Sequence, residues 1–190
     1  MIGIKRMRVA MLFCLASSAG VTRVASAQKV DPGIGVGVGF PTGALGEHRR
    51  PGPVVNAYAL IGSATRTVRL QLGVESAWFS GTHRLSAHAS SAEGDLGIVG
   101  LIANLLIAPH VDGIRPLLAL GGGLQYMSVE NHRNPYGSVP ALRGGIGLEA
   151  PWGKRSVRAE VHFHGILSDF GTGKDFVVGT YVPVSLSLQF

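Results

Sequence analysis

The final segment of the chain constrains the fold most, because its side chains alternate in character up to the last residue. One set is apolar: Val182, Val184, Leu186, Leu188 and Phe190. The interleaved set is mostly polar: Tyr181, Pro183, Ser185, Ser187 and Gln189. Successive side chains of a strand point to opposite faces. The segment is therefore predicted to be a strand with one apolar face, close to the roughly 9–11 residues that a tilted strand needs to cross a bilayer.

The composition is that of an apolar chain without a segment suited to a membrane-spanning helix. Hydrophobic residues make up 46% of the chain and charged residues 15%, which argues against disorder. Yet no run reaches the roughly 18 apolar residues of a transmembrane helix. Two classes fit: a soluble protein with an unusually apolar surface, or a barrel that faces lipid.

The N-terminal residues predict export. An apolar segment over residues 9–20 is followed by Ala25-Ser26-Ala27, which fits the small-x-small pattern of a cleavage site. The basic residues before the apolar segment are Lys5, Arg6 and Arg8. We therefore expect residues 1–27 to be a signal peptide and residues 28–190 to be one mature domain.

Removal of this peptide changes the charge and the cysteine count. Cys14 is the single cysteine and lies in the apolar segment, so the mature chain would have no disulfide. Four of the 17 basic residues lie in residues 1–27, which leaves 17 − 4 = 13 basic against 11 acidic residues. This small excess gives no reason to expect a nucleic-acid partner.

The same alternation, in several cases interrupted by glycine, recurs along the mature chain and predicts further strands. The expected strands are Ile34–Phe40, Val54–Gly62, Val68–Phe79, Leu96–Ala108, Arg115–Ser128, Val139–Ala150, Val157–His164 and Phe176–Phe190. Long, polar connections alternate along the chain with short, turn-like ones. Outer-membrane barrels have this arrangement, with short turns on the periplasmic side and longer external loops. The prediction is an all-β, eight-stranded antiparallel up-and-down transmembrane β-barrel.

Several segments resemble a known family in sequence. The segments are Arg115–Gly123 (RPLLALGGG), Arg143–Glu149 (RGGIGLE), Arg158–Val161 (RAEV) and the terminal Phe190. They are similar to the small eight-stranded outer-membrane barrels of the OmpA/OmpX type. The resemblance implies a monomer in the bacterial outer membrane, in contact with outer-membrane lipid and lipopolysaccharide. It also implies that Phe190 is an assembly signal read by the barrel-assembly machinery, with periplasmic chaperones as transient partners.

The faces expected to point inward carry charge. The predicted interior polar network consists of Arg69, Glu75, Arg143, Glu149, Arg158, Glu160, His162 and His164. An eight-stranded barrel is just wide enough to be filled by side chains, and charges in its interior must be paired. We expect a filled lumen, with a narrow channel as the alternative. Glu160-x-His162-x-His164 is a possible metal half-site, but no third ligand can be named, so no metal or other cofactor is predicted.

The predicted role is structural, or one of surface interaction through external loops, and no catalytic residue is expected. The alternative is a lipid A deacylase-like enzyme, because some barrels of this size have that activity. Those enzymes carry a His and a Ser two residues apart, whereas His164 is followed by Ser168. A soluble lipocalin-like barrel would need an apolar interior and a polar exterior, the reverse of this pattern.

Three local features complete the predictions. The terminal strand should close the barrel against Ile34–Phe40, and Pro183 should coincide with a bulge or an unpaired position in that seam. The basic residues of the long connections are His48, Arg49, Arg50, His83, Arg84, His88, His132, Arg133 and Lys174. Candidates for an aromatic girdle at the bilayer surfaces are Tyr58, Trp78, Phe79, Tyr126, Trp152 and Phe163.

Overall fold

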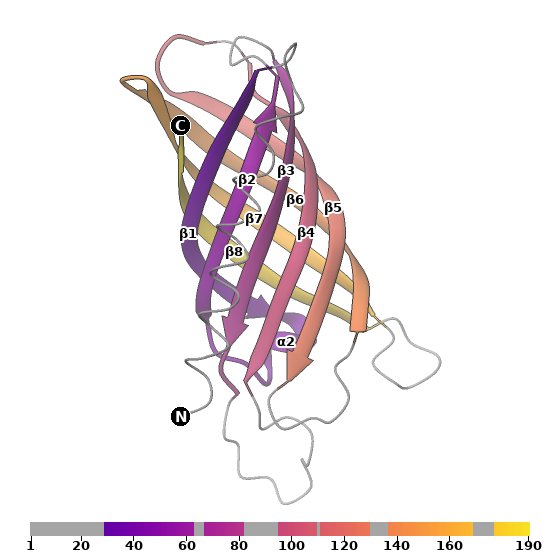
Figure 1. The fold of residues 1–190 in the computed structure, drawn as a ribbon. Coiled ribbons are helices and arrows are strands. Elements are labelled where there is room, and N and C mark those ends of the chain that lie inside the picture. The colour runs from indigo at the N-terminus through magenta and orange to yellow at the C-terminus, as the bar shows by residue number, and fades with distance from the viewer. Residues whose placement is uncertain (1–28, 63–66, 82–94, 110, 130–136, 169–176) are drawn as a thin grey trace, which may run out of the picture.

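The described residues form a closed barrel of eight antiparallel strands (Figure 1). The structure is a computed structural model and describes residues 29–62, 67–81, 95–109, 111–129, 137–168 and 177–190. The strands are β1 Val30–Thr42, β2 Gly52–Ile61, β3 Val68–Phe79, β4 Leu96–Ile107, β5 Arg115–Val129, β6 Gly137–Trp152, β7 Arg155–Ser168 and β8 Val177–Gln189. The predicted fold class is confirmed, and each strand overlaps its expected range.

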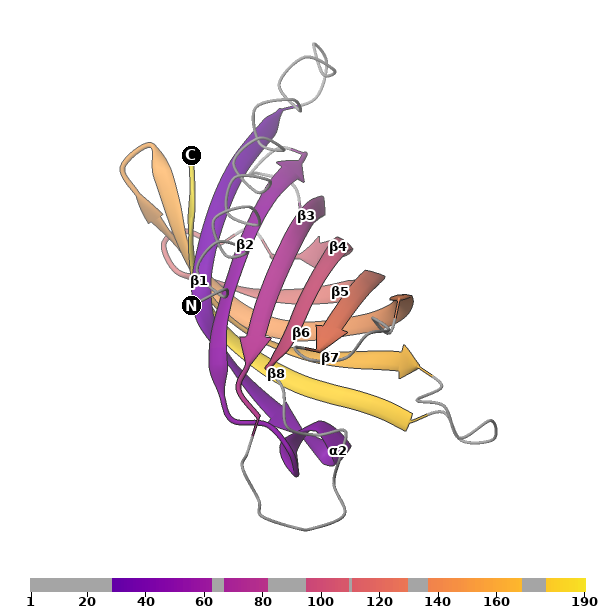
Figure 2. The ribbon, with the colours of Figure 1, turned by 60° about the horizontal axis from the view of Figure 1, so that its bottom comes forward.

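Each strand pairs with its neighbour in sequence, and β8 returns to β1. The closing seam runs from Gly33 opposite Gln189 to Thr42 opposite Thr180, so the expected partnership of the terminal strand is confirmed. Closure matters in lipid, because a free strand edge would leave backbone groups without hydrogen-bond partners. The strands are all tilted in the same sense relative to the barrel axis, as both ribbon views show (Figures 1 and 2).

The two ends of the barrel differ. We call the end with Lys29, Phe190 and the β6–β7 turn the terminal end, and the opposite one the distal end. The first connection lies at the distal end and holds the short helix α2, Gly43–Gly46 (Figure 2). The β6–β7 turn is only residues 153–154, whereas β3 and β4 are separated by residues 80–95. The difference in connection length between the two ends is smaller elsewhere, since the β4–β5 connection (residues 108–114) and the β5–β6 connection (residues 130–136) are equally long.

The outward face is apolar along the strands. Ile146, Leu101 and Val36 are each more than 60% exposed, and many other large apolar side chains are also exposed. In water a contiguous surface of this kind would drive association, whereas lipid solvates it. Since the outward face is apolar and the buried interior holds many charged and polar side chains, a lipocalin-like interpretation does not fit. None of the described helices is long and apolar enough to cross a membrane.

The interior is layered along the axis. An apolar cluster at the distal end includes Phe79, Ile98, Met127 and Ile166, and α2 contributes Leu45 to it. A smaller cluster of Tyr58, Leu60, Leu106 and Ala119 lies nearer the terminal end. Inward polar side chains lie beside the smaller cluster and between the two clusters. On β3, Arg69 is opposite Leu106 and Gln71 is opposite Leu60, and Glu75 follows before the strand reaches Phe79.

Glycines on the inward face of β1 make room for larger side chains from β2. A Cβ atom built on Gly33 would lie 2.3 Å from Cζ of Tyr58, and one on Gly35 would lie 2.6 Å from Oδ1 of Asn56. Both distances are shorter than atoms can approach. The alternation of glycine with apolar residues in β1 therefore reflects a crowded interior.

The prediction that Pro183 interrupts the β1–β8 seam is wrong. That ladder passes Pro183 without a gap, whereas the β7–β8 ladder is continuous up to Val161 opposite Val184 and resumes only at His164 opposite Tyr181. In an antiparallel sheet the N–H and C=O of one residue point to the same neighbouring strand. The gap on the β7 side indicates that the donor which proline lacks would have pointed to β7.

Two of the predicted girdle residues are inside the barrel. Tyr58 is 4% exposed and Phe79 is fully buried, because both lie on the inward parity of their strands. Trp152 and Phe163 are more than half exposed and point outward. The predicted signal peptide, and the loop residues His83, Arg84, His88, His132, Arg133 and Lys174, lie outside the described residues.

Candidate functional site

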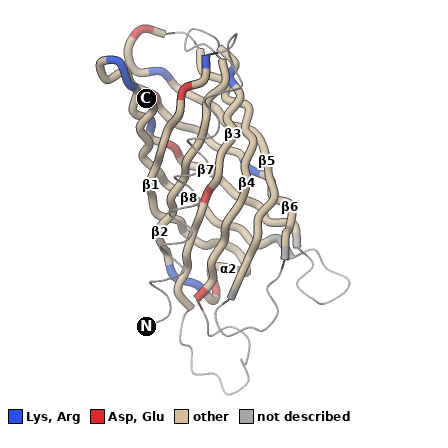
Figure 3. Tube along the Cα trace, viewed as in Figure 1, with Lys and Arg blue, Asp and Glu red and all other residues tan. Residues whose placement is uncertain are grey.

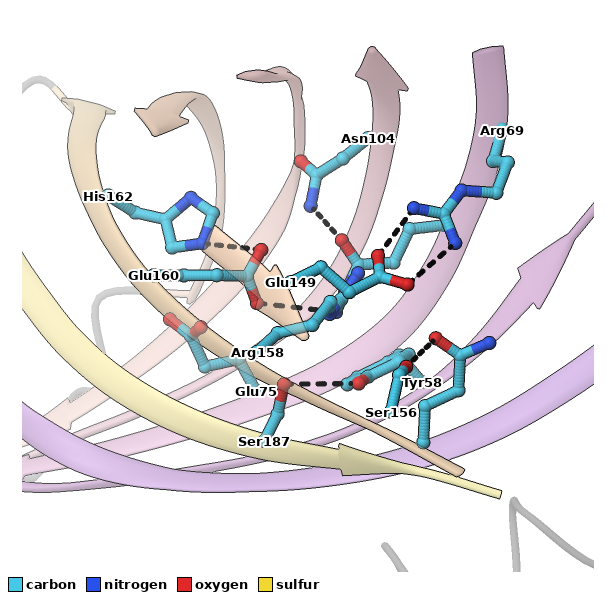
Figure 4. Close-up of polar contacts among 12 residues, drawn as sticks. Tyr58, Arg69, Glu75, Asn104, Glu149, Ser156, Arg158, Glu160, His162 and Ser187 are labelled. Atoms are coloured by element: carbon cyan, nitrogen blue, oxygen red, sulfur yellow. Dashed lines mark hydrogen bonds and ion pairs between the residues drawn. The ribbon is translucent and has the colours of Figure 1, made fainter. Parts of the chain in front are cut away.

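The candidate site is the polar interior, which gathers charged side chains from several strands (Figure 4). The eight residues of the predicted network all point inward, and none is more than 6% exposed. Three are glutamates and three are arginines, so the fixed charges in this set balance. Each carboxylate lies within ion-pair distance of at least one arginine.

Of the three glutamates, Glu149 lies nearest the terminal end. Arg69 donates two hydrogen bonds to it, from Nη2 to Oε2 at 2.6 Å and from Nη1 to Oε1 at 3.5 Å. Arg115 donates a further hydrogen bond to Oε1. Beside this group, Asn104 donates to Gln71 at 3.1 Å. A two-pronged arginine contact of this kind holds a carboxylate in a fixed orientation.

Glu160 forms the middle group with its neighbours on β7. Nη2 of Arg158 lies 3.2 Å from Oε2 of Glu160, and Nε2 of His162 lies 3.4 Å from Oε1. The guanidinium of Arg158 also stacks 4.5 Å from the centre of the Tyr58 ring. Tyr58 in turn donates a hydrogen bond to Ser187 at 3.1 Å. These contacts join β2, β7 and β8 across the interior.

Glu75 forms the group nearest the distal end. Arg143 donates to its Oε2 at 3.1 Å, and the hydroxyl of Tyr181 donates to its Oε1 at 2.9 Å. Nε2 of His164 lies 3.5 Å from the same Oε1. Gln125 lies 3.3 Å from both His164 and Tyr181. Residues from β3, β5, β6, β7 and β8 thus meet around one carboxylate.

Sequence reasoning missed several members of this interior. Arg115, Tyr58, Gln125 and Tyr181 all contact the predicted residues, but none was in the predicted set. The parity of Tyr181 was available in the sequence, since it belongs to the mostly polar set of the terminal strand. What the sequence did not supply was register, which decides which inward residues of neighbouring strands lie at the same height.

The two histidines do not converge on one point. His162 is beside Glu160 and His164 is beside Glu75, and their ring centres are 6.3 Å apart. Within the described residues, no group of three or more His, Cys, Asp or Glu side chains is placed to hold a metal ion. Arg158 and Arg143 beside the two carboxylates would further disfavour a bound cation.

Several layers of the interior are buried from solvent. Arg69, Arg158, His162 and His164 are no more than 2% exposed, as are the distal apolar residues Phe79, Ile98, Met127 and Ile166. Side chains that lined a water-filled channel would be exposed to it. The arrangement can therefore cross-link the barrel walls from within and close the lumen.

Comparisons by sequence give no relative, whereas comparisons of the fold do. No protein-family model matches the chain, and no curated protein matches it in sequence. Among solved structures, Neisserial surface protein A superimposes with a TM-score of 0.60 at 13% identity, over 84% of this chain and 95% of that one. A major outer membrane protein from Thermus thermophilus gives a TM-score of 0.52 at 13% identity, over 85% of this chain and 99% of that one.

The N-terminal β-barrel domain of Pseudomonas aeruginosa OprF is also similar, with a TM-score of 0.51 at 12% identity, over 86% of this chain and 98% of that domain. In all three cases nearly the whole of the other chain is matched by this one. Identities this low establish architecture only. The chain has the fold of the small eight-stranded outer-membrane β-barrels.

Proposed function

We propose that this protein is an integral outer-membrane barrel with a sealed interior, whose role is structural or one of surface contact through its distal end. The observation that carries this proposal is the inverted distribution of polarity. The outward side chains are apolar and exposed, while paired charges are buried inside. Such a molecule suits a membrane, where lipid covers its apolar outer face and the paired charges stay in its interior.

A channel is the less favoured candidate. Conduction needs a continuous polar path, but the distal apolar cluster lies across the lumen at one end of the charged layer. Leu45 of α2 belongs to that cluster, so the first connection helps to close the mouth. Opening a path would require both rearranged ion pairs and displaced apolar side chains.

An enzyme acting on lipid is also less favoured. His164 pairs with Glu75, which resembles part of a catalytic arrangement, but His164 is only 1% exposed and its other neighbours are Gln125 and Tyr181. A membrane lipid could not reach it without separation of the strands. We therefore assign these residues to the interior network and expect no catalysis from them.

The surface role is proposed for the distal end, which would face the outside of the cell. Its first connection is described and carries Glu47, His48, Arg49 and Arg50 beside α2. These side chains would meet lipopolysaccharide or an external partner. Because the barrel is closed and its described strands leave no free edge, we propose a monomer. Phe190 would serve as the assembly signal.

Three measurements test the proposal together. The protein should fractionate with outer membranes and run faster on a gel before boiling than after it, as folded barrels do. Planar bilayers containing it should show no discrete conductance steps. Lipid A from expressing cells should keep its acylation pattern in mass spectra. Soluble periplasmic protein, regular conductance steps or a shortened lipid A would each overturn the corresponding part.

A further inference from the structure

A row of outward side chains crosses three strands at the terminal end. The β6–β7 turn consists of two residues, and its first, Gly153, has φ of 63°, a conformation that other residues rarely adopt. The turn places Trp152 opposite Arg155, on the outward parity of their strands. Phe190 follows at the end of β8, and its ring centre lies 5.0 Å from Cζ of Arg155. The row therefore runs aromatic, cation, aromatic.

A cavity of about 280 Å³ adjoins this row. Among its lining residues are Lys29, Asp31, Arg115, Lys154, Arg155 and Phe190. Lys29 pairs with Asp31, and Arg115 donates to Glu149. In the described part of the chain, Lys154 and Arg155 form no ion pair with a carboxylate. Two cations without a carboxylate partner thus stand together on the β6–β7 hairpin, which the blue segments mark in Figure 3.

The outward face that continues from the row is apolar. Next along the same strands lie Val157 and Leu188, and beyond them Ala159, between Leu148 and Leu186. Leu148 and Leu186 are both more than half exposed. Lipid-facing apolar side chains therefore lead up to a boundary of aromatic rings and positive charge. Aromatic rings and arginine or lysine are the residues that occupy the headgroup level of a bilayer.

We propose that Trp152, Lys154, Arg155 and Phe190, the hairpin surface, bind the headgroup of an anionic phospholipid in the leaflet at the terminal end. Lys154 and Arg155 contact the phosphate, the two rings flank the glycerol region, and an acyl chain lies along the outward face of β7. An acidic soluble protein would match the charges but not the apolar rows. The inference rests on the proposed membrane location and adds a specific lipid site to it.

The two tryptophans of the chain allow a direct test. Trp152 is in the hairpin surface, and Trp78 is on β3 near the distal end. Trp78→Phe leaves Trp152 as the reporter. The protein is placed in vesicles of phosphatidylcholine and phosphatidylglycerol in equal amounts, with bromine on the acyl chains of one lipid or the other. We expect brominated phosphatidylglycerol to quench Trp152 fluorescence more strongly than brominated phosphatidylcholine.

Charge removal should abolish this preference. Arg155→Gln should lower the relative affinity for phosphatidylglycerol about fivefold, and the Lys154→Gln, Arg155→Gln double variant about 25-fold, from roughly 1 kcal/mol per basic residue. Arg50→Gln removes one exposed arginine at the distal end and should leave quenching of Trp152 unchanged. Trp152→Phe makes Trp78 the reporter. Removing the charges of Lys154 and Arg155 should not change how the two brominated lipids quench Trp78.

The outcomes separate this inference from the membrane location. Gel mobility before boiling is measured for every variant, so misfolding is detected independently. A folded, inserted protein whose Trp152 is quenched equally by both lipids would overturn the lipid site alone. Failure of the unaltered protein to insert into vesicles would instead overturn the proposed function. If inorganic phosphate removes the preference in the inserted protein, the site binds a free anion and the lipid assignment is wrong.

Discussion

Replacing Arg143 by methionine removes the cation that faces Glu75 while keeping a long, flexible side chain. The two side chains are 3% and 2% exposed, so neither charge can turn to water when its partner is lost. Breaking a buried pair by removing one member costs about 3–5 kcal/mol, because the other charge stays buried without compensation.

The structure places the expected cost at the lower end of that range, about 3 kcal/mol. Glu75 keeps the hydrogen bond from the hydroxyl of Tyr181 at 2.9 Å and keeps His164 at 3.5 Å. Adding Glu75→Gln to Arg143→Met removes the stranded charge. The double variant should therefore recover most of the lost stability, with a coupling energy of about 2 kcal/mol or more between the two sites.

The assay is urea unfolding of the barrel in phosphatidylcholine vesicles, followed by tryptophan fluorescence. Lys29→Gln is the matched control, because it breaks the pair with Asp31 at a lysine whose side chain is 65% exposed. Exposed pairs contribute only about 0–1 kcal/mol. If Arg143→Met cost no more than this control, or if the double variant equalled the sum of the two singles, the reasoning about the buried pair would be refuted.

Three further predictions concern single positions. A Cβ on Gly145 would lie 2.2 Å from Nδ1 of His162, so Gly145→Ala should destabilise the barrel by about 1–3 kcal/mol. A Cβ on its neighbour Gly144 would meet no described atom closer than 3.8 Å, so Gly144→Ala should be near neutral. Equal urea midpoints for the two variants would contradict this prediction. Pro183→Ala restores a donor toward β7 and should slow amide exchange around the gap in the β7–β8 ladder; unchanged exchange would place the cause of the gap elsewhere. Deleting Phe190 should reduce the fraction of folded barrel in cells more than Trp152→Ala does, as measured by gel mobility before boiling, and normal assembly of the truncated chain would count against its role as a signal.

Much of the architecture could be predicted because a strand in a barrel wall is specified locally. Alternation in Val68–Phe79 indicated both bounds of β3 and the face of most of its residues, although Phe79 was expected in the outer girdle and is buried inside. Boundaries were less certain where the polar–apolar alternation is lost, as in β7, which continues past the predicted His164 through Gly165, Ile166, Leu167 and Ser168. The sequence also failed to predict that the gap at Pro183 is in the β7–β8 ladder and not in the β1–β8 ladder. Parity gives the direction of a side chain but not the neighbouring strand toward which the backbone N–H points.

The sequence by itself determined the closed barrel, the outward and inward faces of most strand residues, and the set of charges placed inside, because a period of two needs no knowledge of the other strands. Only the tertiary structure decided which charges meet. Arg143 of β6 reaches Glu75 of β3 across the lumen, and Arg69 of β3 reaches Glu149 of β6. These partners are not neighbours in the sheet, so their contact depends on strand tilt and on the register of every intervening seam. The same registers bring Trp152, Arg155 and Phe190 into one row at the terminal end.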